Sequence, residues 1–157
     1  MTQGLSEKEA KILDELTERY QKLEAVKTEI LNAYELLRTC YEHDGKLLIA
    51  GNGGSCADSE HIVGELMKGF VKRRPLPDEL WQKICQESPE HGEELARSLQ
   101  GGLMAIALTG HAGLSTAFAN DVNGDMTFAQ QVCGYGRAGD VFLAIPRLEI
   151  PRTLTMR

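Results

Sequence analysis

The chain has 157 residues, 42% of them hydrophobic and 25% charged, which suits one domain with a substantial core. Its net charge of −6 argues against the broad basic surface that binds the phosphate backbone of nucleic acids. No run of about 20 apolar residues occurs, and the start, MTQGLSEKEAKILDEL, is a charged helix pattern rather than a secretory signal. We therefore expect a cytoplasmic protein without nucleic-acid or membrane partners.

The N-terminal region is amphipathic. From Ser6 to about Tyr41, apolar residues recur at mostly three- and four-residue steps, which predicts one long helix or two helices with a kink. A helix of this length exceeds what a small sheet can cover. We expect either that part of its apolar face packs against another subunit or that the helix lies wholly on its own domain.

Three short apolar runs predict strands buried on both faces: KLLIA at 46–50, LMAIALT at 103–109 and DVFLAI at 140–145. Helical patterns at 56–70 and in MTFAQQVCGYG at 126–136 alternate with them. This order predicts an α/β fold with a doubly wound parallel sheet. The intervening segment 73–102 is too long for a simple loop, and we expect it to form one or two short helices.

The stretch GNGGS after the first strand predicts a ligand loop. In parallel α/β sheets, ligands sit where strands end and helices begin. Gly53 and Gly54 let backbone N–H groups approach an anion, Ser55 adds a hydroxyl, and the helix start adds a positive dipole end. The loop has neither the dinucleotide spacing G-x-G-x-x-G nor a Walker lysine, so a nucleotide site is not indicated.

His61 and Glu65 are four residues apart, so they project from one face of the predicted helix. This spacing suits a metal pair or a base with an orienting partner, and equally a solvated pair that supports the helix. A second polar cluster, Asn120 and Asp121, follows the second strand and is expected at the same edge of the sheet.

Taken in order, four pieces of this sequence resemble the sugar isomerase (SIS) domain family, and most closely its phosphoheptose isomerase branch. They are GNGGS, ADSEHIVGEL, AND at 119–121 and GYGRAGDVFLAI. The resemblance spans about residues 12–145 and implies one SIS domain with flavodoxin-like layering. A helical region would occupy residues 1–44 and an α/β core residues 45–145. The segment 80–102 is longer than usual for that branch.

The resemblance implies a sugar-phosphate substrate, namely sedoheptulose 7-phosphate, which is isomerised through an enediol. Glu65 would be the catalytic base and would also bind zinc together with His61, one ion per subunit. Asn52, Gly53, Gly54, Asn120 and Asp121 would line the substrate pocket. Members of the family are homotetramers whose sites draw on neighbouring subunits.

The sequence departs from the family after Ile145. The family continues with a phosphate loop, S-T-S-G-N-S, and further metal ligands, whereas this chain reads PRLEIPRTLTMR. Codons permitted for these residues, read with one extra base before Pro146, spell S-T-S-G-N-S-A-N. We therefore expect that a single-base deletion made 146–157 a non-native tail, that the C-terminal part of the fold is missing and that the isomerase is impaired.

A non-catalytic SIS module is the alternative interpretation. Such a module would sense a sugar phosphate or scaffold a partner, and the replication-initiator-associating proteins, which share the fold and the glycine loop, are an example. As the resemblance has it, those proteins lack a carboxylate where Glu65 stands. The presence of both His61 and Glu65 in this chain therefore favours the enzyme.

Overall fold

A three-stranded parallel sheet forms the centre of the computed structural model, which describes residues 5–146. The strands lie in the order β2 (Ala105–Ala107), β1 (Leu47–Gly51) and β3 (Val141–Ile145). Leu47 is in register with Ala105 on one side and with Val141 on the other. The predicted parallel sheet is confirmed. The predicted non-native tail lies, apart from Pro146, outside the described residues.

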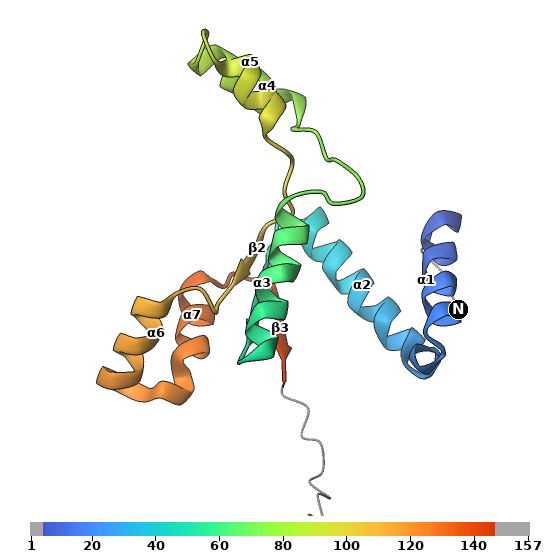
Figure 1. Ribbon diagram of the computed structural model, residues 1–157, viewed down its shortest axis with the longest axis vertical. Coiled ribbons are helices and arrows are strands. Elements are labelled where there is room, and N and C mark those ends of the chain that lie inside the picture. The colour runs from blue at the N-terminus through green and yellow to red at the C-terminus, as the bar shows by residue number, and fades with distance from the viewer. Residues whose placement is uncertain (1–4, 147–157) are drawn as a thin grey trace, which may run out of the picture.

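Alternate residues of β1 point to opposite faces of the sheet and nucleate two hydrophobic clusters. One cluster consists of Leu47, Ile49 and Ala105. The other consists of Leu48, Ala50 and Leu108. Helices α2 (Lys27–Glu42) and α3 (Gly54–Met67) cover the first cluster, and α7 (Thr127–Tyr135) covers the second. Helices on both faces confirm the predicted doubly wound arrangement (Figure 1).

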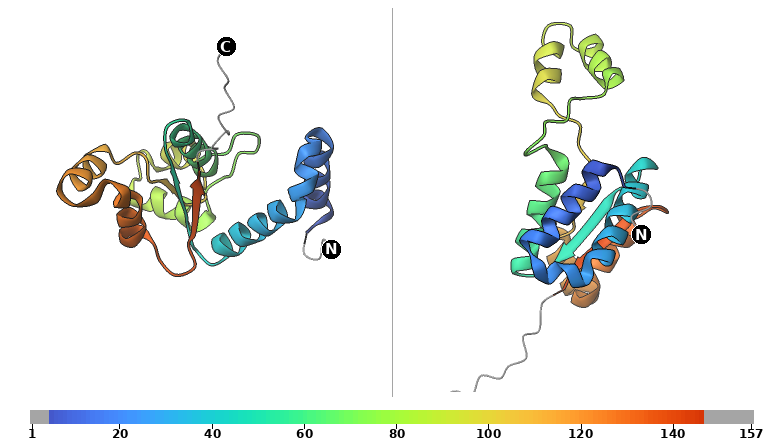
Figure 2. Two further views of the ribbon diagram at one scale, coloured as in Figure 1. Left: turned by 90° about the horizontal axis from the view of Figure 1, so that it is seen from below. Right: turned by 90° about the vertical axis from the view of Figure 1, so that its right-hand side faces the viewer.

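The N-terminal region forms two helices, which is the second of the two predicted alternatives, but they are joined by a reversal of the chain rather than by a kink. Helix α1 (Glu7–Arg19) stops before Tyr20, whose backbone dihedral angles, φ −125 and ψ 77, are not helical. A 3₁₀ segment (Gln21–Val26) then leads into α2. The two helices form a hairpin, of which only the C-terminal part of α2 packs on the sheet (Figures 1 and 2).

Polar contacts hold the α1–α2 hairpin together at the start of α1. Ser6 and Glu9 form a reciprocal capping box, and the Tyr34 hydroxyl donates to the Glu9 carboxylate from α2. Hydrogen bonds from the Ser6 side chain, then from Tyr34 and the Ser6 backbone, lower the pKa of Glu9 to about 2. Glu9 is therefore ionised at neutral pH and joins the two helices.

The segment between α3 and β2 contains two short helices, as predicted, and they form a second hairpin. Helix α4 (Asp78–Glu87) and helix α5 (Gly92–Ser98) pack on each other and stand away from the sheet on two extended connections (Figures 1 and 2). The connections are tied together at their base. The Arg74 guanidinium donates to the Gly101 and Leu66 carbonyl oxygens, at 2.9 and 2.5 Å, and thereby caps the C-terminus of α3.

After β2 the chain forms α6 (Ala112–Phe118), a π-helical turn (Ala119–Asn123), a 3₁₀ turn (Gly124–Met126) and α7. The expectation that β3 is buried on both faces is wrong. Phe142 and Leu143 in β3 are 48% and 38% exposed, because no described helix covers them. Within the described residues, no helix is long and apolar enough to cross a membrane.

A nearly buried ion pair joins the starts of β1 and β3. Lys46 Nζ lies 2.6 Å from Asp140 Oδ2, and their side chains are only 13% and 8% exposed. The other Asp140 contacts are backbone N–H groups, from Lys46 at 3.0 Å and from Arg137 at 2.7 Å. The Lys46 side chain, followed by these N–H groups, holds the pKa of Asp140 below its ordinary value of 3.8.

We predict that Asp140→Asn lowers the free energy of unfolding by about 3 kcal/mol, because the variant leaves Lys46 as a nearly buried charge without a partner. Since the folded pKa of Asp140 is depressed, its contribution is complete above pH 3.8 and disappears as the pH falls through the folded value. Urea unfolding of the variant should therefore show a smaller loss of stability on acidification than the parent protein does.

The matched control is Asp44→Asn, which changes an exposed aspartate in a left-handed turn conformation that asparagine also adopts. Its stability should stay within about 0.5 kcal/mol of the parent. Equal stability of the Asp140→Asn and Asp44→Asn variants would contradict a stabilising role for the ion pair.

Candidate functional site

The junction of β1 and α3 depends on the absence of a side chain at Gly51. A Cβ atom at this position would lie 2.5 Å from the Ser55 carbonyl oxygen and 2.7 Å from the Ser55 Cβ. Only glycine therefore lets the first turn of α3 pass so close to the end of β1. Gly53 has φ +58 and ψ −121, a combination that is open to glycine but strained for other residues.

The loop presents two backbone donors to open space. Ser55 and Cys56 donate their N–H groups to the Asn52 and Gly53 carbonyl oxygens, at 3.1 Å each. The N–H groups of Gly53 and Gly54 donate to no described residue. The space around both glycines is open, since a Cβ atom at either would meet nothing within 4 Å. These two N–H groups lie at the positive end of the α3 dipole and can donate to a ligand oxygen.

A polar pocket of about 450 Å³ opens beside this loop. It lies between the end of β1, the start of α3, and the segment from β2 to α7. Its lining residues are Gly51, Asn52, Gly53, Cys56, Thr109, Ser115, Gly124, Asp125, Thr127 and Phe128. The lining offers hydroxyl groups, an amide and one carboxylate, but no lysine or arginine. This chemistry suits a polar, hydroxyl-rich ligand better than a dianion.

The predicted site residues do not all meet in this pocket. Asn52 and Gly53 line it, whereas Gly54, Ser55, His61 and Glu65 on α3 do not, and neither do Asn120 and Asp121. The chain reaches these two residues only after α6, where they lie exposed in the π-helical turn rather than directly after β2. The pocket lining instead includes Thr109, Ser115 and Asp125, which the sequence analysis did not select because each is a common residue type in a loop or short helix.

The outward face of α3 connects the glycine loop with His61 and Glu65. Gly54, Asp58, His61 and Glu65 follow one another at steps of four, three and four residues, so they share one face of the helix. The opposite face, with Ser59 and Ile62, packs on the sheet. Gly54 and Glu65 are about 16 Å apart along the axis, and a glutamate side chain leans back toward the N-terminus.

His61 and Glu65 form a loose, solvent-facing pair. His61 Nε2 lies 3.9 Å from Glu65 Oε1, and the two side chains are 78% and 41% exposed. Both donor types suit zinc, but a catalytic zinc centre takes three protein ligands. In the part of the chain that the structure describes, no group of three or more histidine, cysteine, aspartate or glutamate side chains is placed to hold a metal ion. The pair thus fits two positions of a zinc site and needs a further ligand.

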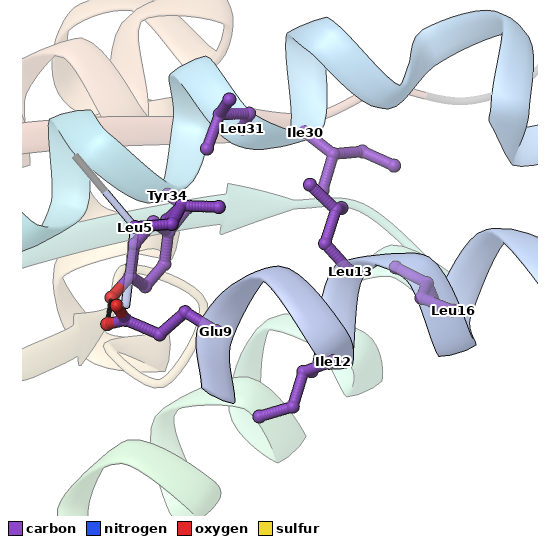
Figure 3. Close-up of a pocket in the computed structure, with 8 residues that line it drawn as sticks. All are labelled: Leu5, Glu9, Ile12, Leu13, Leu16, Ile30, Leu31 and Tyr34. Carbon is purple, nitrogen blue, oxygen red and sulfur yellow. Dashed lines mark hydrogen bonds between the residues drawn. The ribbon is translucent and has the colours of Figure 1, made fainter. Parts of the chain in front are cut away.

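A second hollow, of about 190 Å³, lies between α1 and α2 (Figure 3). Its lining residues are Leu5, Glu9, Ile12, Leu13, Leu16, Ile30, Leu31 and Tyr34. The only polar side chains among them, Glu9 and Tyr34, are hydrogen-bonded to each other. This hollow offers an apolar surface and no free donor, so it is not a site for a sugar.

Comparisons with known proteins find relatives that match most of the chain. The sequence profile of the SIS domain matches residues 12–100. The chain is 36% identical over 115 residues to a phosphoheptose isomerase from Neisseria gonorrhoeae (strain NCCP11945), covering 73% of this chain and 45% of the relative. It is 31% identical over 132 residues to a phosphoheptose isomerase from Halorhodospira halophila, covering 84% and 54%.

A solved structure has a similar fold. The structure of phosphoheptose isomerase GmhA from Neisseria gonorrhoeae matches with a TM-score of 0.56 and 30% sequence identity, covering 87% of this chain and 58% of that one. The chain thus spans about half the length of the curated relatives that it matches. The shared part contains β1, the glycine loop and α3.

We predict that Gly51→Ala destabilises the protein by about 1–3 kcal/mol, because the new methyl group collides with the backbone of Ser55. Gly64→Ala is the matched control on the outward side of α3, where a Cβ meets nothing within 4 Å. It should stabilise the helix by up to about 1 kcal/mol. Chemical denaturation of both variants measures the difference, and a Gly51→Ala protein as stable as the parent would contradict the close approach.

Proposed function

Because this chain belongs to the SIS domain family, and because its relatives are phosphoheptose isomerases, we propose that it isomerises sedoheptulose 7-phosphate to D-glycero-D-manno-heptose 7-phosphate. The observation that carries the proposal is the outward face of α3. It carries Gly54, at the start of the helix, and Glu65 on one solvent-exposed side. A sugar phosphate bound on this side of the helix would have its two ends in different environments.

Glu65 is the proposed base. In an aldose–ketose isomerisation the base removes a proton from the carbon next to the carbonyl group, which gives an enediol, and the proton returns to the neighbouring carbon. Glu65 is a carboxylate that is 41% exposed, so a substrate can reach it. His61, one turn earlier on the same face, lies close enough to orient this carboxylate or to share a ligand with it.

The pocket beside the glycine loop is the proposed seat of the sugar hydroxyl groups. Asn52 supplies an amide, Thr109 and Ser115 supply hydroxyls, and the N–H groups of Gly53 and Gly54 are free to donate. The Asp125 carboxylate in the same lining accepts hydrogen bonds from hydroxyls but repels a phosphate. Ser55, Asn120 and Asp121 would bind substrate from the rim of this site, as the family resemblance implies.

Zinc, subunit assembly and location belong to the same proposal. His61 and Glu65 would hold one zinc ion, which polarises a bound carbonyl group when present. In the family that the chain resembles, the further metal ligands lie after the position of Ile145, and the sites of the homotetramer draw on neighbouring subunits. Exposed apolar side chains on the N-terminal hairpin, among them Ile12 and Leu36 at 58% each, support such assembly. The proposed location is the cytoplasm.

The proposal predicts that Glu65→Gln slows proton exchange at the substrate at least about 100-fold, since glutamine cannot accept the proton. Incubation with sedoheptulose 7-phosphate in D₂O, followed by NMR, detects deuterium entering next to the carbonyl carbon even when net turnover is slow. The parent protein should catalyse this exchange.

Glu29→Gln serves as the control, because Glu29 is an exposed glutamate on α2 away from the proposed site. It should exchange at the parental rate. Equal rates for the Glu65→Gln and Glu29→Gln proteins would show that Glu65 is not the base. Saturable binding of the sugar phosphate without any exchange in the parent would instead favour a non-catalytic binding module.

A further inference from the structure

Two adjoining segments outside the proposed site carry opposite charges. The segment of residues 68–74, here called the basic loop, contains Lys68, Lys72, Arg73 and Arg74 and no carboxylate. The hairpin of α4 and α5, residues 78–98, here called the acidic hairpin, contains six carboxylates and two cations. The two segments follow each other directly in the chain and project from the same end of the molecule (Figure 1).

The basic loop is also apolar at its tip. Phe70 and Val71 are 77% and 93% exposed, the largest exposed fractions among the large hydrophobic side chains that the structure describes. Lys68 and Lys72 flank them and are exposed as well. Two adjacent hydrophobic side chains that are exposed to water are unfavourable in a loop that contacts only solvent. The tip of the basic loop therefore indicates a contact surface.

The acidic hairpin presents a matching surface. Leu80 on α4 and Leu95 on α5 are 44% and 48% exposed, and Leu99 directly after α5 is 50% exposed. Glu87 lies seven residues after Leu80 and therefore on the same face of α4. Glu94 is an exposed neighbour of Leu95 on α5. The hairpin thus combines leucines with carboxylates, as the loop combines Phe70 and Val71 with lysines.

The chain does not pair these two surfaces within itself. Among the described residues, no ion pair joins the basic loop to the acidic hairpin, and the one ion pair within the hairpin links Arg97 to Glu93. Arg73 and Arg74 donate to backbone carbonyl oxygens at the base of the hairpin. These bonds fix the base and leave Lys68 and Lys72 without a carboxylate partner in the described chain.

We propose that the basic loop of one copy docks on the acidic hairpin of a second copy. Because each copy carries both surfaces on one projecting unit, a two-fold pair satisfies both at once, loop on hairpin and hairpin on loop. Exposed Phe70 and Val71 meet exposed leucines, while lysines meet carboxylates at the rim. This interface is separate from the N-terminal hairpin and does not depend on the isomerase activity.

Charge reversal tests the proposal across copies. Variant A carries Lys68→Glu and Lys72→Glu, and variant B carries Glu87→Lys and Glu94→Lys, all at exposed positions. In either variant alone, like charges face each other at both contacts of the pair, so self-association should weaken at least about tenfold. In an equimolar mixture of A and B, every loop of one variant meets a hairpin of opposite charge on the other, so association should return.

Sedimentation velocity at low and high salt measures how far the parent, each variant and the mixture associate. The parent should associate, and high salt should weaken this association because the contact is partly ionic. Circular dichroism checks that both variants stay folded, and Phe70→Ser with Val71→Ser should weaken association without a charge change. The proposal is overturned if variants A and B associate like the parent, if their mixture is no tighter than either alone, or if the parent shows no salt-sensitive association. The last result would leave this surface to a different protein.

Discussion

The close approach of α3 to the end of β1 is the constraint on which the site depends. Gly51 has no Cβ, so the Ser55 carbonyl can lie where a side chain would otherwise stand. The chain can then leave the buried strand through Gly53, at φ +58, and enter the helix immediately. This junction fixes the direction of α3, and with it the row of residues from Gly54 to Glu65 on its outward face.

The rest of the described fold holds this junction in place. Leucine and isoleucine side chains of β1 are buried on both faces, and the Lys46–Asp140 pair joins β1 to β3 at the opposite end of the strand. At the far end of α3, Arg74 caps the helix and also ties down the base of the α4–α5 hairpin. The helix that carries the proposed base is thus fixed at its first turn and at its last.

Local patterns predicted the core of this arrangement from the sequence. The apolar run at 46–50, followed by glycines, is typical of a buried strand that ends in a tight turn. The spacing of apolar residues in the segments after the first and second strands predicted α3 and α7. Local patterns gave wrong predictions where the burial of a segment depends on which other elements cover it. The pattern of β3 indicates burial, yet burial requires a covering layer, and no described element covers Phe142. The break after Arg19 has no proline or glycine to signal it.

The candidate site was predictable in part, for a similar reason. His61 and Glu65 share a helix face because four residues make about one turn, which sequence spacing alone determines. The pocket beside the glycine loop is assembled from β1, α3 and the segment from β2 to α7, so Thr109, Ser115 and Asp125 emerge only from the tertiary structure. Asn120 and Asp121 fall outside its lining because α6 carries the chain away before reaching them.

If the free amide groups of the glycine loop bind the sugar, their NMR signals must respond to it. Spectra of ¹⁵N-labelled protein during titration with sedoheptulose 7-phosphate measure this response. We expect saturable shifts of the Gly53 and Gly54 amide signals, and weaker effects from inorganic phosphate alone. Binding that shifts other signals but leaves those of Gly53 and Gly54 in place would contradict this role of the amide groups.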